Sequence, residues 1–145
     1  MSETVGKVPA WYWIVAVLAV LWEATGCYFY LMQVRMGPEE LALLPAAQAD
    51  AFAAMATWQW AMFAIAVWSG LMGAIGLLGR SRFAVWPLAL SLIASIIQYG
   101  YVFAATPILS AMSAAEAVPL PATIIVLGAV LVWFASAARK NGWLR

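Results

Sequence analysis

Histidine is absent from this chain, and cysteine occurs once, at Cys27. Histidine is the commonest protein ligand for zinc, copper and haem iron, and the commonest general base at neutral pH. A single cysteine forms no internal disulfide and makes no metal site by itself. We therefore expect no bound metal and no cofactor, and the chain is not predicted to be an enzyme.

Charged residues are scarce as well. They make up 9% of the 145 residues, whereas hydrophobic residues make up 67% and the mean hydropathy is +0.95. A soluble domain carries roughly 25% charged residues. The composition therefore predicts a single integral membrane domain over residues 1–145, surrounded by the lipid bilayer and without a nucleic-acid partner. Both lysines, Lys7 and Lys140, lie outside the apolar stretches, so a buried Schiff base of the retinal type has no anchor.

The apolar residues form four long stretches, and a helix of about 20 apolar residues crosses a bilayer core. We expect an all-α fold, a four-helix transmembrane bundle, with spans at about 11–33, 51–78, 83–106 and 122–138. In the first long connection, Gly37-Pro38-Glu39-Glu40 predicts a short helix at about 38–44, since proline and carboxylates favour a first helical turn. In the second, Ser113-Ala114-Ala115-Glu116 is a capping-box pattern.

Basic residues gather at one end of the predicted bundle, and four of the six acidic residues lie at the other. Cytoplasmic loops of membrane proteins carry an excess of Lys and Arg. The distribution therefore predicts that both termini are cytoplasmic and that both proline-containing connections lie outside. The basic group is Lys7, Arg80, Arg82, Arg139, Lys140 and Arg145, whereas Arg35 lies on the other side with Glu39, Glu40, Asp50 and Glu116.

Glu23 is the one charged residue within the first span, close to its centre. A charged side chain there costs about 2.5 to 3.5 kcal/mol on insertion scales. Two interpretations are open. In one, Glu23 is a proton- or cation-coupled site at which a ligand or ion competes with the proton. In the other, Glu23 is a protonated structural group that hydrogen-bonds across the bundle to Gln98 or Gln59.

Small residues accompany this carboxyl group. Gly26 lies one turn after Glu23, and Gly70, Gly73 and Gly76 recur at every third position of the second span. Small residues let helix backbones approach closely in membranes. The four glycines are therefore predicted packing positions, with a hinge in the second span as the alternative.

Aromatic side chains also lie deep in the spans, among them Trp22 and Tyr99. Deep aromatic rings stack on flat or cationic ligands, or they face lipid or the protein core. On the first interpretation of Glu23, the predicted ligand- or ion-binding residues are Glu23, Gln98, Gln59, Trp22 and Tyr99.

Three stretches carry a resemblance over nearly the whole chain: WYWIVAVLAVLWEATG at the first span, MGPEELALLPAA in the first connection, and ARKNGWL after the fourth span. With these stretches the chain resembles a group of small, largely uncharacterised bacterial four-span proteins, some of them labelled sugar transporters. The resemblance implies a multi-pass protein of the bacterial inner membrane and implies little about activity.

The motif Trp22-Glu23-Ala24-Thr25-Gly26 is similar to one in the first helix of small multidrug resistance transporters, which also have four spans. In that family a Glu followed three residues later by Gly binds protons and cationic drugs in turn. The resemblance implies this role for Glu23 and Gly26, and an aromatic role for Tyr99 or Trp68. The longer outer loops, the longer chain and the one-sided charge distribution depart from that family and its dual-topology antiparallel dimer.

From these observations we expect a small oligomeric membrane protein of transport type, with Glu23 as its central ionisable group. The alternative is a non-catalytic accessory or structural subunit of a larger membrane complex, which would pack its glycine face and apolar surface against a partner. The expected partner is thus a further copy of the chain or another complex. A third hypothesis is an enzyme that acts on lipids through Glu23, Tyr28 and Ser95, but no motif supports it.

Overall fold

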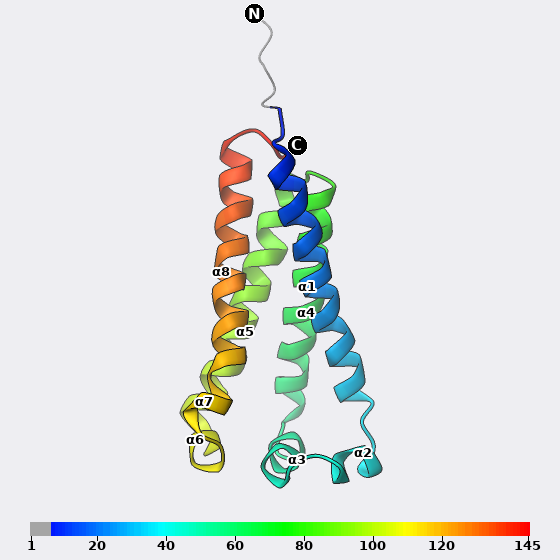
Figure 1. The fold of residues 1–145 in the computed structure, drawn as a ribbon, viewed down its shortest axis with the longest axis vertical. Helices are drawn as coiled ribbons and strands as arrows, with labels where there is room; N and C mark the ends of the chain where they lie inside the picture. The colour runs from blue at the N-terminus through cyan, green and yellow to red at the C-terminus, as the bar shows by residue number, and fades with distance from the viewer. Residues whose placement is uncertain (1–6) are drawn as a thin grey trace, which may run out of the picture.

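The computed structural model describes residues 7–145, and every regular element in this range is helical (Figure 1). This confirms the all-α fold. Four segments are long and apolar enough to cross a membrane. They contain the helices α1 (Ala10–Val34), α4 (Thr57–Leu78), α5 (Val85–Ala105) and α8 (Pro119–Lys140).

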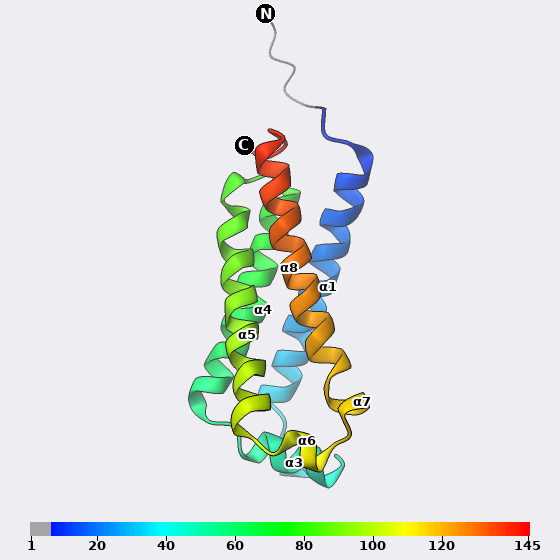
Figure 2. The ribbon, with the colours of Figure 1, turned by 90° about the vertical axis from the view of Figure 1, so that its left-hand side faces the viewer.

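Four short helices lie at the end of the bundle opposite the C-terminus (Figures 1 and 2). Two of them begin as the sequence indicates. The Glu40 carboxylate accepts a 2.6 Å hydrogen bond from Gly37 N, and the Glu116 carboxylate accepts a 3.2 Å bond from Ser113 N. Each bond satisfies a free amide at a helix start. The short helices are α2 (Pro38–Ala42), α3 (Ala46–Ala53), α6 (Ile108–Ala111) and α7 (Ala114–Ala117).

Two of the predicted spans begin at other residues. The second does not start near Ala51, because Ala51 belongs to α3 and the chain leaves the helix before Thr57. The Gln59 side chain marks this restart by accepting a 2.9 Å hydrogen bond from Ala56 N. The fourth span starts earlier than expected, at Pro119, since proline fits a first helical turn, where its missing N–H has no partner to lose. The third span is preceded by a short 3-10 turn, Arg82–Ala84.

The long helices pack in chain order, α1 against α4, α4 against α5, and α5 against α8. Trp11 of α1 contacts Phe134 of α8 and Trp143 after it, with ring centroids 5.8 and 5.4 Å apart. From this end α1 and α8 diverge towards the short helices (Figure 1). Three of the predicted packing glycines lie on α4. A Cβ added at Gly73 would lie 2.5 Å from Leu88 Cγ, and one added at Gly76 would lie 3.0 Å from Ala84 Cβ. These positions let α5 and the turn before it lie directly against α4; Gly70 is described with the site below.

Tyr12 is the centre of the apolar core. Its hydroxyl donates a 2.6 Å hydrogen bond to Leu77 O on α4, and its ring stacks on Phe134 of α8 with centroids 5.4 Å apart. The Arg80 guanidinium donates a 2.7 Å bond to Trp143 O, which ties the C-terminal segment to the turn after α4. The buried apolar cluster lies in this half of the bundle, near the basic end, and includes Ala16, Ala19, Ala74, Ala84, Leu88, Leu131, Ala135 and Ala138.

Candidate functional site around Glu23

Glu23 lies near the middle of α1, on the face that packs against α4. The buried residues Ala19 and Cys27 are one turn before and one turn after it. Residues four apart on a helix share one face. The carboxyl group is therefore directed into the bundle by the same pattern that buries its neighbours.

Gly70 provides the space that this carboxyl group occupies. A Cβ built at Gly70 would lie 2.6 Å from Glu23 Cδ and 2.9 Å from Ser91 Oγ. Any side chain at position 70 would therefore collide with the carboxyl group. Residues of three helices meet at this point: Glu23 of α1, Gly70 of α4 and Ser91 of α5.

The hydrogen bonds around the carboxyl group are directed elsewhere. Ser91 Oγ donates a 2.6 Å bond to Ala66 O, so its proton is already committed and a lone pair remains. Within residues 7–145 no group donates a hydrogen bond to the Glu23 carboxyl, and no basic side chain forms an ion pair with it. No described protein group therefore occupies the hydrogen-bonding positions of the Glu23 carboxyl oxygens.

Contacts beside the carboxyl group hold α1 close to α4. The Cys27 thiol donates a 3.3 Å bond to Val67 O, and a Cβ at Gly26 would meet Val67 Cγ1 at 3.4 Å, an ordinary contact. The distance between the two helices at Glu23 is therefore set on the neighbouring turn. Because that contact comes from an apolar residue and a thiol, it adds no charge to the site.

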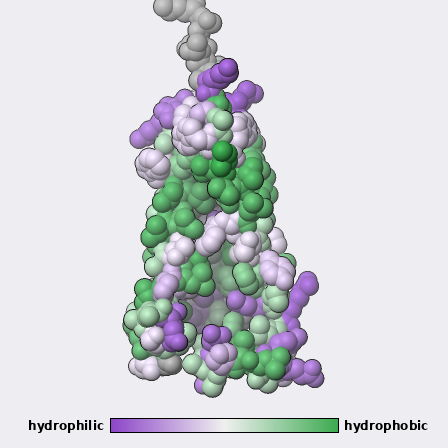
Figure 3. All heavy atoms as spheres, viewed as in Figure 1, coloured by the Kyte–Doolittle hydropathy of each residue, from purple (hydrophilic) through white to green (hydrophobic). Residues whose placement is uncertain are grey.

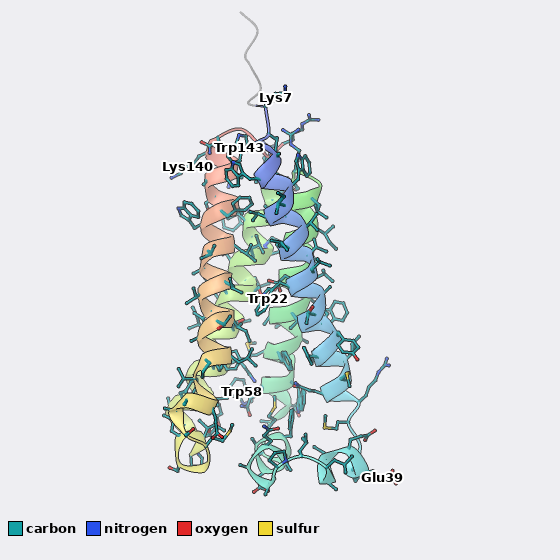
Figure 4. The ribbon with its side chains drawn as sticks, viewed as in Figure 1. Lys7, Trp22, Glu39, Trp58, Lys140 and Trp143 are labelled. Carbon is teal, nitrogen blue, oxygen red and sulfur yellow. The ribbon has the colours of Figure 1, made fainter. Side chains whose placement is uncertain are left out.

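Trp22 and Tyr99 lie on the sides of their helices that face α8. Trp22 follows Trp11 by three helical turns, and the Trp11 ring contacts Phe134 of α8 at 5.8 Å. Tyr99 follows Leu92 by two turns, and Leu92 packs against Gly128 of α8. Both side chains are half-buried, and Figure 4 places Trp22 at mid-height of the bundle.

The structure does not bring Gln98 or Gln59 to Glu23. Gln98 lies two turns beyond Ser91 on the same face of α5, roughly 10 Å further along the helix axis. It is 9% exposed, and its Oε1 atom has no hydrogen-bond partner. Gln59 is 4% exposed, and its Oε1 caps the start of α4. The hydrogen bond from Glu23 to either glutamine, expected on the structural interpretation, is not formed among the described residues.

The half of the bundle with the two glutamines is less tightly closed than the half with Tyr12. Figure 3 shows a hollow between α8 and α1, on the side of the short helices. Trp58 lies in this part of the bundle, near the short helices (Figure 4). Its ring contacts the Tyr101 ring edge-on, with centroids 4.7 Å apart. A cavity of about 200 Å³ lies where α2 and α3 approach the ends of α1 and α4. It is lined by Gln33, Val34, Met36, Leu41, Phe52, Ala53 and Trp60.

Sequence reasoning placed Glu23 at the centre of the site but missed the role of two neighbours. In the sequence nothing separates Ser91 from the other serines of the apolar stretches, Ser69 and Ser95, and Gly70 was predicted as one of several packing glycines. Their position against the carboxyl group depends on the register of α1, α4 and α5. A single sequence does not show how three helices are aligned with one another. Comparison of the chain with protein-family models, with curated proteins and with solved structures finds no match, so the interpretation of the site rests on its geometry.

Proposed function

We propose that this chain is a small oligomeric membrane protein of transport type, in which Glu23 is a proton- or cation-coupled site. The observation that carries the proposal is the unpartnered Glu23 carboxyl group, seated over Gly70 in the middle of the bundle. An isolated carboxylate away from water is costly. The group is therefore expected to hold a proton until a cationic or hydrogen-bonding ligand replaces it.

The surrounding geometry supports exchange at this position. The apolar core near Tyr12 closes one half of the bundle, whereas the other half contains the hollow and the unpartnered Gln98 Oε1. A solute entering from the short-helix end would meet polar groups before reaching Glu23. Trp22 and Tyr99, on the α8-facing sides, would then flank its path.

The proposed setting is the bacterial inner membrane, with both termini in the cytoplasm. Lys7 and Lys140 lie at the end opposite the short helices, whereas Glu39 lies on α2 (Figure 4). Arg80 belongs to the same end as Lys7, since it is hydrogen-bonded to Trp143 O. Cytoplasmic segments carry the excess of Lys and Arg. On this proposal α2, α3, α6 and α7 are outside, and the hollow is open towards that side.

Charge movement after a rapid pH change tests the proposal. Purified protein in liposomes is adsorbed to a solid-supported membrane, and the transient current is recorded after a pH jump. The unaltered protein is expected to give a current whose size changes when a primary amine, a monovalent cation or a sugar is present. Glu23→Gln is expected to abolish the current, whereas Glu39→Gln, which removes an exposed carboxylate from α2, is expected to retain it. A full-sized current from Glu23→Gln would refute the assignment.

The second candidate function, an accessory subunit, is favoured by one feature of the packing. Helix α8 packs along α5 and reaches α1 through the aromatic cluster near Trp143, so a long apolar flank stays uncovered. Native mass spectrometry after gentle extraction from the source membrane separates the two proposals. Homo-oligomers without companions support transport, and a fixed ratio to other chains supports the accessory role.

A further inference from the structure

A groove between α5 and α8 at the basic end has a chemistry that the site around Glu23 does not use. Its volume is about 410 Å³, and it is lined by Val85, Ser136, Arg139 and Lys140. Val85 is the first residue of α5, and the two basic residues belong to the last turn of α8. The groove thus combines two cations, one hydroxyl group and one apolar wall.

No carboxylate side chain of residues 7–145 faces this groove, and the Arg145 backbone oxygen accepts a 2.9 Å hydrogen bond from Arg82 N. Every carboxylate side chain among the described residues lies elsewhere: Glu23 is in the middle of the bundle, and the others are on or beside the short helices at the opposite end. No ion pair involves Arg139 or Lys140 within residues 7–145. The positive end of the α5 dipole offsets the negative end of the α8 dipole at this position. Among the described side chains, an anion in the groove therefore meets two cations and no carboxylate.

The surroundings of the groove are those of a membrane interface. Trp86 follows Val85 on α5 and is 65% exposed, and Trp133 lies one turn before Ser136 on α8 and is 69% exposed. Exposed tryptophans are typical of the headgroup level of a bilayer. Further along the same helices, Leu90 and Val130 are exposed apolar residues. A molecule with its anionic group in the groove would therefore have apolar surface beneath it.

We propose that the groove between α5 and α8 binds the phosphate of an anionic glycerophospholipid, with Arg139 and Lys140 as the phosphate ligands and Ser136 as a hydroxyl donor. The acyl chains lie along the exposed apolar flank of the two helices. Basic pockets between transmembrane helices are known to take anionic headgroups. This proposal does not depend on the function assigned to Glu23.

Lipid retention in native mass spectrometry tests the proposal. The full-length protein is titrated with phosphatidylglycerol and with phosphatidylcholine of the same acyl chains. Phosphatidylglycerol is expected to bind the more tightly. Each basic group near a membrane surface contributes about 1 kcal/mol, so Arg139→Gln/Lys140→Gln is expected to weaken its binding about thirtyfold. The matched control, Lys7→Gln/Arg82→Gln, removes the same charge from the same end outside the groove and is expected to leave lipid binding close to that of the unaltered protein.

A second variant distinguishes the contribution of the groove's shape to lipid binding from that of its charge. Ser136→Leu fills the groove without altering any charge, and it is expected to reduce phosphatidylglycerol retention while thermal unfolding stays unchanged. Arg139→Lys is expected to retain binding, which shows that the position tolerates substitution. Equal losses in the two double variants, or equal retention of the two lipids, would overturn the proposal. Competition by inorganic phosphate at the concentration of the lipid would also overturn it, because the groove would then be a free-anion site.

Discussion

Gly73→Ala tests how tightly α4 and α5 are packed. A methyl group at this position would lie 2.5 Å from Leu88 Cγ, 2.8 Å from its Cδ2 and 3.1 Å from its backbone nitrogen. Rotation of the leucine side chain relieves the first two contacts, but the third is to the backbone. The two helices must therefore separate by several tenths of an ångström.

The magnitude follows from two opposing effects. Overpacking a close contact costs about 1 to 3 kcal/mol, whereas alanine is about 1 kcal/mol better than glycine inside a helix. Gly73→Ala should therefore lower the free energy of unfolding by up to about 2 kcal/mol. Gly100→Ala has no atom within 4 Å of the new Cβ, so only the helix propensity acts and the variant should gain about 1 kcal/mol.

Equilibrium unfolding in mixed micelles measures this difference, with tryptophan fluorescence as the readout. Gly26→Ala is an intermediate control, because its Cβ would make an ordinary 3.4 Å contact with Val67. The expected order of stability is Gly100→Ala, then Gly26→Ala, then Gly73→Ala. If Gly73→Ala were as stable as Gly100→Ala, the close approach of α4 and α5 would be wrong.

Three further substitutions examine the site and the core. Gly70→Ala places a methyl group on the Glu23 carboxyl, so the pH-jump current should fall by more than half while the helical circular dichroism is retained. Gln98→Met removes a buried oxygen that has no partner, so it should raise the free energy of unfolding by about 1 kcal/mol; a loss of that size would show that Gln98 is hydrogen-bonded. Tyr12→Phe removes a buried hydrogen bond and should lower stability by about 1 kcal/mol, whereas Tyr28→Phe on the exposed face should leave it unchanged in the same unfolding assay.

Much of the fold was predictable because membrane-spanning helices carry a strong composition signal. Long apolar stretches separated by proline and charged residues define the four long helices, and capping pairs define two of the four short ones, α2 and α7. The boundary near Thr57 was missed because residues 46–53 have the same alanine-rich character as a span start. Only the break at Ala54–Ala56, capped by Gln59, shows that α3 is separate.

The central residue of the candidate site, Glu23, could be predicted from the sequence, whereas its contacts with Gly70 and Ser91 could not. A carboxyl group in the centre of an apolar span stands out in any sequence, because its burial requires a compensating interaction or a function. Its neighbours depend on the relative rotation and height of three helices. The shift of Gln98 by about two turns from Glu23 follows from that register, and no local pattern in the sequence encodes it.

Four features could be predicted from the chain alone: the helical class, the four apolar segments, the separation of most basic from most acidic residues, and the position of Glu23 along α1. Each of these follows from composition and from the rise of a helix, which are local properties. Three others required the folded chain: Glu23 lies over Gly70 beside Ser91, Arg139 and Lys140 share a groove with Val85, and α8 diverges from α1. These contacts join residues far apart in the chain, and side-chain packing between helices sets them.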